Sequence, residues 1–263
     1  MKNFRSILLF TAVALSVLTA SAQAGLQDGL LGYYPFNPGD AIGVDSSGNG
    51  RDGVLGGSPL PVKGPDIVKN PEAAAHFVRG GYVDIDSFRT VDLTSYSIVT
   101  WFQLDELSLD NTLVARGPSG PLVSSIGLMV QDDELIGEHE PDGINGIQVK
   151  IPGVEANRWY GAAFTYDATD ELMKLYLSSC ILEKASRSGI QPPGNPLEDY
   201  PLVLGANGEH HSLLAGSLDE VRIYDRALTE SEVTYLLTGC VPEPATLLLL
   251  GLGGLGLLRR RKT

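Results

Sequence analysis

Cysteine, positive charge and helical periodicity are all scarce in this 263-residue sequence. Two cysteines are present, and 19 lysines and arginines stand against 32 aspartates and glutamates, which gives a formal net charge of -13 at pH 7. Proteins bind nucleic acids and anionic lipid surfaces mainly through lysine and arginine, so the composition argues against both partners. The Gly-x-Ser-x-Gly turn of many serine hydrolases is also absent from the sequence.

The first 24 residues have the parts of a secretory signal peptide. Lys2 and Arg5 precede an apolar run at 7–18, and the small residues at 20–24 offer two overlapping cleavage sites. The run is about twelve residues long, whereas a membrane-spanning helix needs about twenty. We therefore predict a signal peptide at 1–24 rather than a first transmembrane helix, followed by one exported domain at 25–240.

The last 23 residues combine a proline-flanked glutamate, an apolar run at 245–258 and a basic cluster. The motif is Pro242, Glu243 and Pro244, and the cluster contains Arg259, Arg260 and Arg261. Together they resemble the PEP-CTERM sorting signal. The resemblance implies an exosortase as partner, a precursor held in the inner membrane by the apolar tail helix, and delivery to the cell surface or extracellular matrix. The alternative is a simple C-terminal anchor.

An exported chain enters an oxidising compartment, where disulfides form. Cys180 and Cys240 are therefore predicted to form one disulfide. Two free thiols are the alternative, because a sequence does not fix the Cα separation that a bridge requires.

Short apolar or alternating runs bounded by Gly, Pro, Asn and Asp recur along the exported part, which is typical of an all-β sandwich. The continuous apolar run at 96–104 predicts a central strand. One helix is predicted from Thr229, where Thr229 and Glu232 fit a capping box, and it should lie across one edge of the sandwich. Further strands are predicted at 30–36, 74–77, 82–86, 112–115, 125–131, 134–137, 146–151, 160–166, 172–177, 202–205 and 216–224, and a long loop at 186–201.

Four stretches together resemble the LamG-like, concanavalin A-like jelly roll of bacterial surface proteins. They are 31–37 with 45–53, 76–85 with 96–102, 157–167 with 174–177, and 216–228. The resemblance spans about residues 29–237 and implies a two-sheet jelly-roll sandwich. The family's usual Asp-Gly turn is replaced here by Ser178-Ser179-Cys180, so this hairpin is expected to differ.

Some relatives on this fold cleave glycans, and they need two carboxylates that flank the scissile bond. No Glu-x-Asp-x-x-Glu pattern occurs, and Glu138 and Glu140 are interpreted as a solvated edge rather than an acid/base pair. His210 and His211 are not assigned to a metal, because no third ligand is signalled. The sequence therefore predicts a non-enzymatic module that binds extracellular polysaccharide or a surface protein. The alternative is a hydrolase or lyase with an unrecognised catalytic pair.

The resemblance implies that the first and last strands lie close together, so a structural calcium ion is predicted at Asp45, Asn49 and Asp219, with Glu220 as a further ligand. Removing both ends takes six basic residues and one acidic residue from the chain, which shifts the net charge from -13 to -18. Such an acidic domain suits divalent cations, and the glycine-rich loop after Asp45 can supply oxygen ligands. The alternative is an ordinary Asx turn at Asp45 without an ion.

Overall fold

The computed structural model describes residues 25–66, 73–107, 110–117, 125–140, 146–179, 181–190 and 200–237. The predicted signal peptide, Cys180, Cys240 and the whole sorting tail lie outside these residues. In the described part, no helix combines the length and the apolar character needed to cross a membrane.

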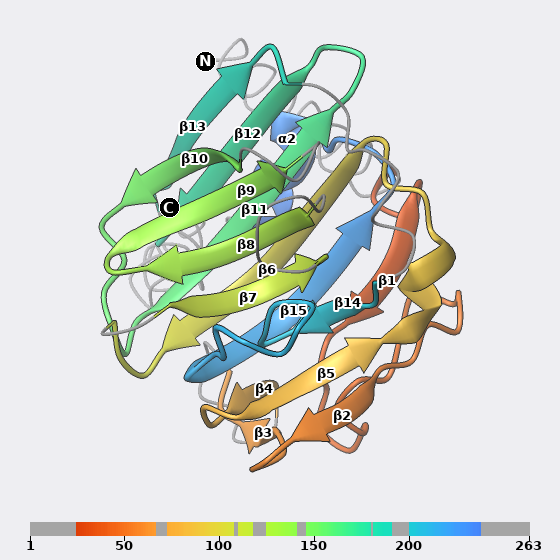
Figure 1. The fold of residues 1–263 in the computed structure, drawn as a ribbon, viewed down its shortest axis with the longest axis vertical. Helices are drawn as coiled ribbons and strands as arrows, with labels where there is room; N and C mark the ends of the chain where they lie inside the picture. The colour runs from red at the N-terminus through yellow and green to blue at the C-terminus, as the bar shows by residue number, and fades with distance from the viewer. Residues whose placement is uncertain are drawn as a thin grey trace, which may run out of the picture.

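Two antiparallel sheets are stacked face to face (Figure 1), which confirms the predicted all-β sandwich. The eight-stranded sheet has the order β13-β12-β11-β6-β15-β4-β3, with β1 paired to β15. The seven-stranded sheet has the order β10-β9-β8-β7-β14-β5-β2. The strands are β1 (Leu30–Tyr34), β2 (Val54–Gly57), β3 (Val62–Gly64), β4 (Ala74–Phe77), β5 (Gly81–Ile85), β6 (Tyr96–Leu104), β7 (Asn111–Arg116), β8 (Ser125–Gln131), β9 (Glu134–Glu140), β10 (Ile147–Pro152), β11 (Trp159–Asp167), β12 (Leu172–Ser178), β13 (Leu182–Ser188), β14 (Leu202–Leu204) and β15 (Gly216–Tyr224). A short 3-10 helix, η1, spans Asp86–Thr90 and one α-helix, α2, spans Glu230–Leu237.

Strand β6 is central in its sheet, as its apolar run predicts, because β11 and β15 pair with it on either side. Tyr96 and Phe102 face the gap between the sheets, where they belong to the main core. The Tyr96 hydroxyl lies 2.8 Å from Nδ1 of His139 in the opposite sheet. Val99 faces outward into a second apolar cluster. Both faces of β6 are therefore buried, which explains why its apolar residues do not alternate.

Helix α2 begins with the predicted capping box. The Glu232 amide donates to Thr229 Oγ1 at 3.3 Å, and the Glu232 carboxylate accepts from the Thr229 amide at 2.8 Å. Its predicted position at a sandwich edge is wrong. Val233 and Leu237 pack with Val99 against the outer face of the eight-stranded sheet, because β6 and β11 present small and apolar side chains there.

Three strands escaped the sequence prediction because their residues lack the expected pattern. β2 contains two glycines and β3 has three residues. β13 is almost entirely polar and exposed, since it is an edge strand paired only with β12. The predicted loop at 186–201 is therefore wrong at its start, where residues 186–188 belong to β13.

Candidate functional site

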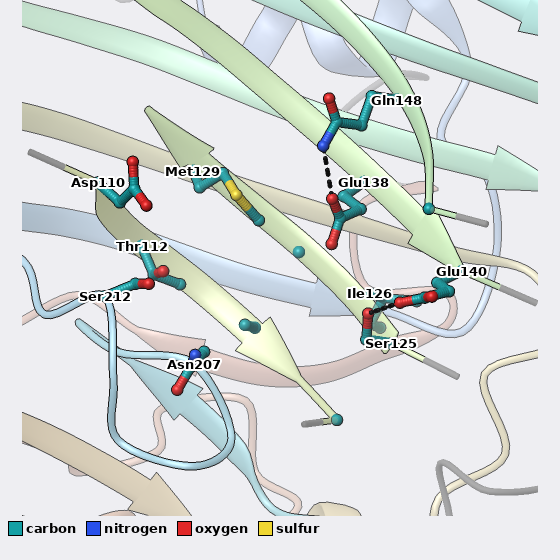
Figure 2. A pocket seen from close by; sticks show the side chains of 14 residues that line it. Asp110, Thr112, Ser125, Ile126, Met129, Glu138, Glu140, Gln148, Asn207 and Ser212 are labelled. Carbon is teal, nitrogen blue, oxygen red and sulfur yellow. Dashed lines mark hydrogen bonds between the residues drawn. The ribbon is translucent and has the colours of Figure 1, made fainter. Parts of the chain in front are cut away.

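A groove of about 500 Å³ lies on the outer face of the seven-stranded sheet. Figure 2 shows its polar side chains converging from β7, β8, β9 and β10, with the loop after β14 along one side. The residues that line it are Asp110, Thr112, Ala115, Gly117, Ser125, Ile126, Gly127, Met129, Glu138, Glu140, Gly146, Gln148, Asn207 and Ser212. Three other hollows in the described part of the chain are smaller, at about 140, 230 and 380 Å³.

Strand alternation decides which side chains reach the groove. On β9, Leu135 and His139 belong to the buried interior, while Glu138 and Glu140 point to the opposite face. On β10, Val149 packs in the core and its neighbour Gln148 lines the groove. The alternate residues that face the core thus fix the strand register, and this register turns the polar residues between them outward.

Two hydrogen-bonded pairs hold the groove carboxylates. Gln148 Nε2 donates to Glu138 Oε2 at 2.6 Å, across the β9–β10 pairing. Ser125 Oγ donates to Glu140 Oε2 at 3.2 Å, across the β8–β9 pairing. Both bonds are drawn in Figure 2. Side chains held in this way offer a pre-ordered set of acceptors and donors to a polar ligand.

The interpretation of Glu138 and Glu140 as a solvated edge is wrong for Glu140, whereas Glu138 is partly exposed. They belong to strand β9, which continues to Glu140 because β8 and β10 pair with it up to that end, and Glu140 is only 8 % exposed. Sequence reasoning also missed Gln148 and Asn207, which carry no motif. The alternation of Glu138, His139 and Glu140 beside apolar neighbours was the one available signal.

A shallower hollow of about 380 Å³ continues the groove, sharing Asp110 and Ser212 with it. It is formed largely by the loop at 205–213, which Asn207 organises by accepting the amides of Glu209 and His211 at 3.2 and 2.7 Å. The loop is fastened to β5 through one histidine. The His210 ring stacks on Tyr82 at 3.7 Å and 6°, and its Nε2 lies 2.8 Å from Asp84 Oδ1.

We expect His210→Ala to loosen this loop without unfolding the domain. Stacking and one hydrogen bond together contribute about 1–2 kcal/mol, so local opening should become roughly tenfold more frequent. Hydrogen exchange of the amides at 208–212 measures the change. His211→Ala is the matched control on the same loop, and equal exchange in both variants would show that His210 does not fasten it.

The predicted calcium residue Asp45 is engaged by its own loop. Its carboxylate accepts the amides of Tyr33, Ser47 and Arg51 at 3.0, 2.8 and 2.9 Å, and the Ser47 hydroxyl at 2.8 Å. Burial acts to raise the pKa of Asp45, but the three amide hydrogen bonds outweigh it and hold that pKa below its ordinary value. The Ser47 amide bond is the Asx turn that a loop of this composition forms without an ion.

Two of the other predicted ligands also form hydrogen bonds within the protein. Asn49 Nδ2 donates to the carbonyl oxygens of Leu30 and Leu31 at 2.8 and 3.1 Å, and Glu220 accepts from the Tyr33 hydroxyl. Across the described ranges, no group of three or more His, Cys, Asp or Glu side chains could hold a metal ion. Calcium at this site stays a prediction.

Asp219 is a buried acidic residue with a strongly raised pKa. It lies on β15 at a bulge, is 7 % exposed, and accepts the Glu220 amide at 2.7 Å. Burial, followed by the negative charge of Glu220, raises the pKa of Asp219 from 3.8 to about 8. Glu220 itself has a positive φ of 54°. Asp219 belongs to the eight-stranded sheet and does not line the groove, which lies on the other sheet.

Comparisons with known proteins agree with both parts of the sequence interpretation. A family model described as the concanavalin A-like lectin/glucanases superfamily matches residues 78–234. A model of the PEP-CTERM protein-sorting motif matches residues 241–262. No curated protein matches the chain.

Several solved structures share the fold. One is domain 4 of AbnA, an extracellular GH43 arabinanase from Geobacillus stearothermophilus, in complex with arabinotriose. Its TM-score is 0.62 and its sequence identity is 24%, and the match covers 79% of this chain and 98% of that domain. Another is the receptor-binding domain of botulinum neurotoxin mosaic serotype C/D, with a TM-score of 0.57 and 13% identity over 80% of this chain and 51% of that one. The binding domain of botulinum neurotoxin serotype D gives 0.56 and 12% over 80% and 52%. At these identities the likeness shows the fold alone.

Proposed function

This chain belongs to the concanavalin A-like lectin/glucanase superfamily and carries a PEP-CTERM sorting motif, and from that premise we propose that it is a surface-displayed glycan-binding protein. The motif indicates an exported, membrane-processed protein directed to the cell surface. The ligand would be an extracellular polysaccharide, held in the groove of the seven-stranded sheet. An exosortase would process the tail near Pro242, Glu243 and Pro244, after the tail has tethered the precursor to the inner membrane.

The observation that carries this proposal is the pre-ordered polar lining of the groove. Sugar hydroxyls both donate and accept hydrogen bonds, and the Glu138–Gln148 pair presents acceptor oxygens beside amide hydrogens on one rigid sheet face. Side chains fixed by strands lose little conformational freedom on binding, which favours affinity for a weakly held, flexible polymer. Support also comes from the similar fold of AbnA domain 4, whose structure contains arabinotriose.

We expect Glu138→Ala to weaken glycan binding by at least about tenfold, because a hydrogen bond to a charged group contributes about 1.5–3 kcal/mol. The measurement is a polysaccharide array followed by titration calorimetry of the full chain in detergent. Glu134→Ala is the matched control: Glu134 lies on the same strand, but its partner is Lys150 at 3.1 Å and it does not line the groove. Binding that is equal in both variants would place the ligand elsewhere, and an empty array would refute the proposed function.

A second function has one observation in its favour. Glu138 and Glu140 stand two residues apart on β9 and line the same groove. Most glycosidases act through a pair of carboxylates that flank the scissile bond. Release of reducing ends from a bound polysaccharide, abolished by Glu140→Gln, would establish a hydrolase in place of a binding module.

A further inference from the structure

We propose that the protein has a second ligand site, a carboxylate-binding hollow between strands β12 and β13 and the first turn of helix α2. The hollow has a volume of about 230 Å³. It lies on the outer face of the eight-stranded sheet, so it is separate from the groove of the seven-stranded sheet and does not depend on the proposed glycan-binding function. The described residues that line it are Lys174, Tyr176, Lys184, Ala185, Ser186 and Glu230.

The strand register brings the hydrogen-bond donors of this hollow to one face of the sheet. Lys174 and Tyr176 stand two residues apart on β12, so they point to the same side. On β13, Ser186 lies directly opposite Lys174, and Lys184 lies directly opposite Tyr176. Tyr176 belongs to the apolar cluster under α2, which identifies this side as the outer face. Side chains with donors therefore surround one small volume from two strands.

The hydroxyl of Tyr176 is the strongest sign of a missing ligand. In the part of the chain that the structure describes, this hydroxyl has no hydrogen-bond partner, although the residue is completely buried. Buried hydroxyl groups are normally paired, because an unpaired one has lost its bonds to water without replacement. Burial, followed by the negative charge of Glu230, raises the pKa of Tyr176 to about 12, so the hydroxyl stays protonated. It therefore offers a donor to an acceptor atom placed in the hollow.

The charges around the hollow favour an anion. Lys184 Nζ holds both oxygens of Glu230, at 2.8 and 2.9 Å, so the one carboxylate among the described lining residues is already neutralised. Lys174 forms no ion pair with a described residue. The hydrogen bond and charge of Lys184, and then the charge of Lys174, lower the pKa of Glu230, which indicates that both ammonium groups lie near it. The charge of Lys174 is left for a ligand.

Acidic side chains limit the site to one side of Lys174. A neighbouring hollow of about 140 Å³ shares Lys174 and is also lined by Asp167 and Asp170. An anion in that hollow would meet two carboxylates, and like charges repel. We therefore place the ligand on the side of Lys174 that faces Tyr176 and Lys184.

A carboxylate matches this set of donors. Its two oxygens have about four acceptor positions, enough for the Lys174 ammonium and the Tyr176 and Ser186 hydroxyls. The pairing of Lys184 with Glu230 shows that a carboxylate fits against a lysine in this hollow. The Lys184 and Glu230 side chains are 56% and 54% exposed, so their weak surface pair can move aside and open the way to the Tyr176 hydroxyl.

The test compares melting temperatures of the full chain in detergent at pH 7. One solution contains about 100 mM sodium galacturonate, and the other contains sodium chloride and galactose at the same concentrations, so the two sugars differ only in the carboxylate. A site with a Kd of about 10 mM should raise the melting temperature by about 3–6 °C in galacturonate. Equal melting temperatures in the two solutions would overturn the inference.

Two tyrosines provide a matched pair of variants. Tyr224 is also completely buried in the same apolar cluster, and its hydroxyl also has no partner in the described structure, but it does not line the hollow. We expect Tyr176→Phe to reduce the galacturonate shift to about 1 °C or less, because binding loses one hydrogen bond, and Tyr224→Phe to keep it. Without ligand, neither variant should melt earlier than the unsubstituted protein, since each loses only an unpaired hydroxyl. A shift that survives Tyr176→Phe, or falls equally in Tyr224→Phe, would contradict the site.

Charge variants separate the hollow from the rest of the surface. Lys174→Gln should also remove most of the shift, whereas Lys150→Gln, which removes the same charge from β10 in the other sheet, should leave it unchanged. A shift that is lost in Glu138→Ala and kept in Tyr176→Phe would place the carboxylate in the groove and overturn the inference.

Hexagalacturonate at the same carboxylate concentration identifies the source of the carboxylate. A larger shift than that with galacturonate would identify an acidic polysaccharide as the ligand, because neighbouring sugars then add contacts outside the hollow. An equal or smaller shift would identify a small free carboxylate. In both cases the shift should be sensitive to Tyr176→Phe.

Discussion

Replacing Arg116 by methionine is expected to lower the melting temperature by about 10 °C. Arg116 is fully buried, and its guanidinium donates to the carbonyl oxygens of Val91, Arg89 and Tyr200 at 2.7, 3.3 and 3.2 Å. Methionine keeps much of the volume but removes all three charge-assisted bonds and leaves those carbonyls without this donor. The loss is about 3–4 kcal/mol, and for a domain of this size 1 kcal/mol corresponds to about 2–4 °C.

The matched control is Arg89→Met. The Arg89 side chain is 46% exposed and pairs with Asp86 at 2.9 Å, so its removal should cost less than about 1 kcal/mol. Differential scanning calorimetry measures both variants. An Arg116→Met melting temperature within 2 °C of the unsubstituted protein would mean that the segments after β5 and before β14 hold their positions without this guanidinium.

Replacing Asp219 by asparagine is expected to stabilise the protein at pH 8 and to leave its stability unchanged near pH 4. Folding raises the pKa of Asp219 to about 8 through burial and the charge of Glu220. Between about pH 4 and pH 8 the folded chain therefore holds a proton that the unfolded chain has released, and stability falls as the pH rises through this window. Asparagine cannot ionise, and its amide oxygen can still accept the Glu220 amide.

The expected gain is roughly 5 °C in melting temperature at pH 8, equivalent to about 2 kcal/mol. Melting curves at pH 4, 6 and 8 in the presence of a chelator test it. Asp40→Asn, which removes the same charge from an exposed loop, is the control and should shift the curve little at any pH. A variant that is no more stable than the unsubstituted protein at pH 8 would contradict this prediction, because it would show that the folded chain tolerates the ionised Asp219 carboxylate.

Arg116 and Asp219 are expected to affect stability, and neither of them lines the groove. Effects on stability can therefore be distinguished from effects on ligand binding. Arg116 ends the strand that supplies Thr112 and Ala115 to the groove, so its loss should impair binding through unfolding. Asp219 lies in the opposite sheet, so its substitution should change stability without changing glycan affinity. A variant that changes affinity at unchanged melting temperature therefore points to the groove itself.

The sequence alone determined the fold class, most strands and the helix start. Strands such as β6 and β11 can be predicted from sequence because burial on both faces requires continuous apolar residues. The helix start can be predicted because Thr229 and Glu232, three positions apart, form the capping box by themselves. The sorting motif is likewise a local signal, because its apolar run and basic cluster follow each other in sequence.

Only the tertiary structure decided where the groove lies and which side chains fill it. Asn207 lines the groove together with residues of β7 to β10 that precede it by 59 or more positions. No local sequence pattern predicts that residues so far apart line one groove. Glu138 and Glu140 appear as ordinary surface acids until the pairing of β9 with both neighbours orders them on one face. The edge strand β13 was missed for the related reason that backbone hydrogen bonds to β12 hold it, and these need no particular side chain.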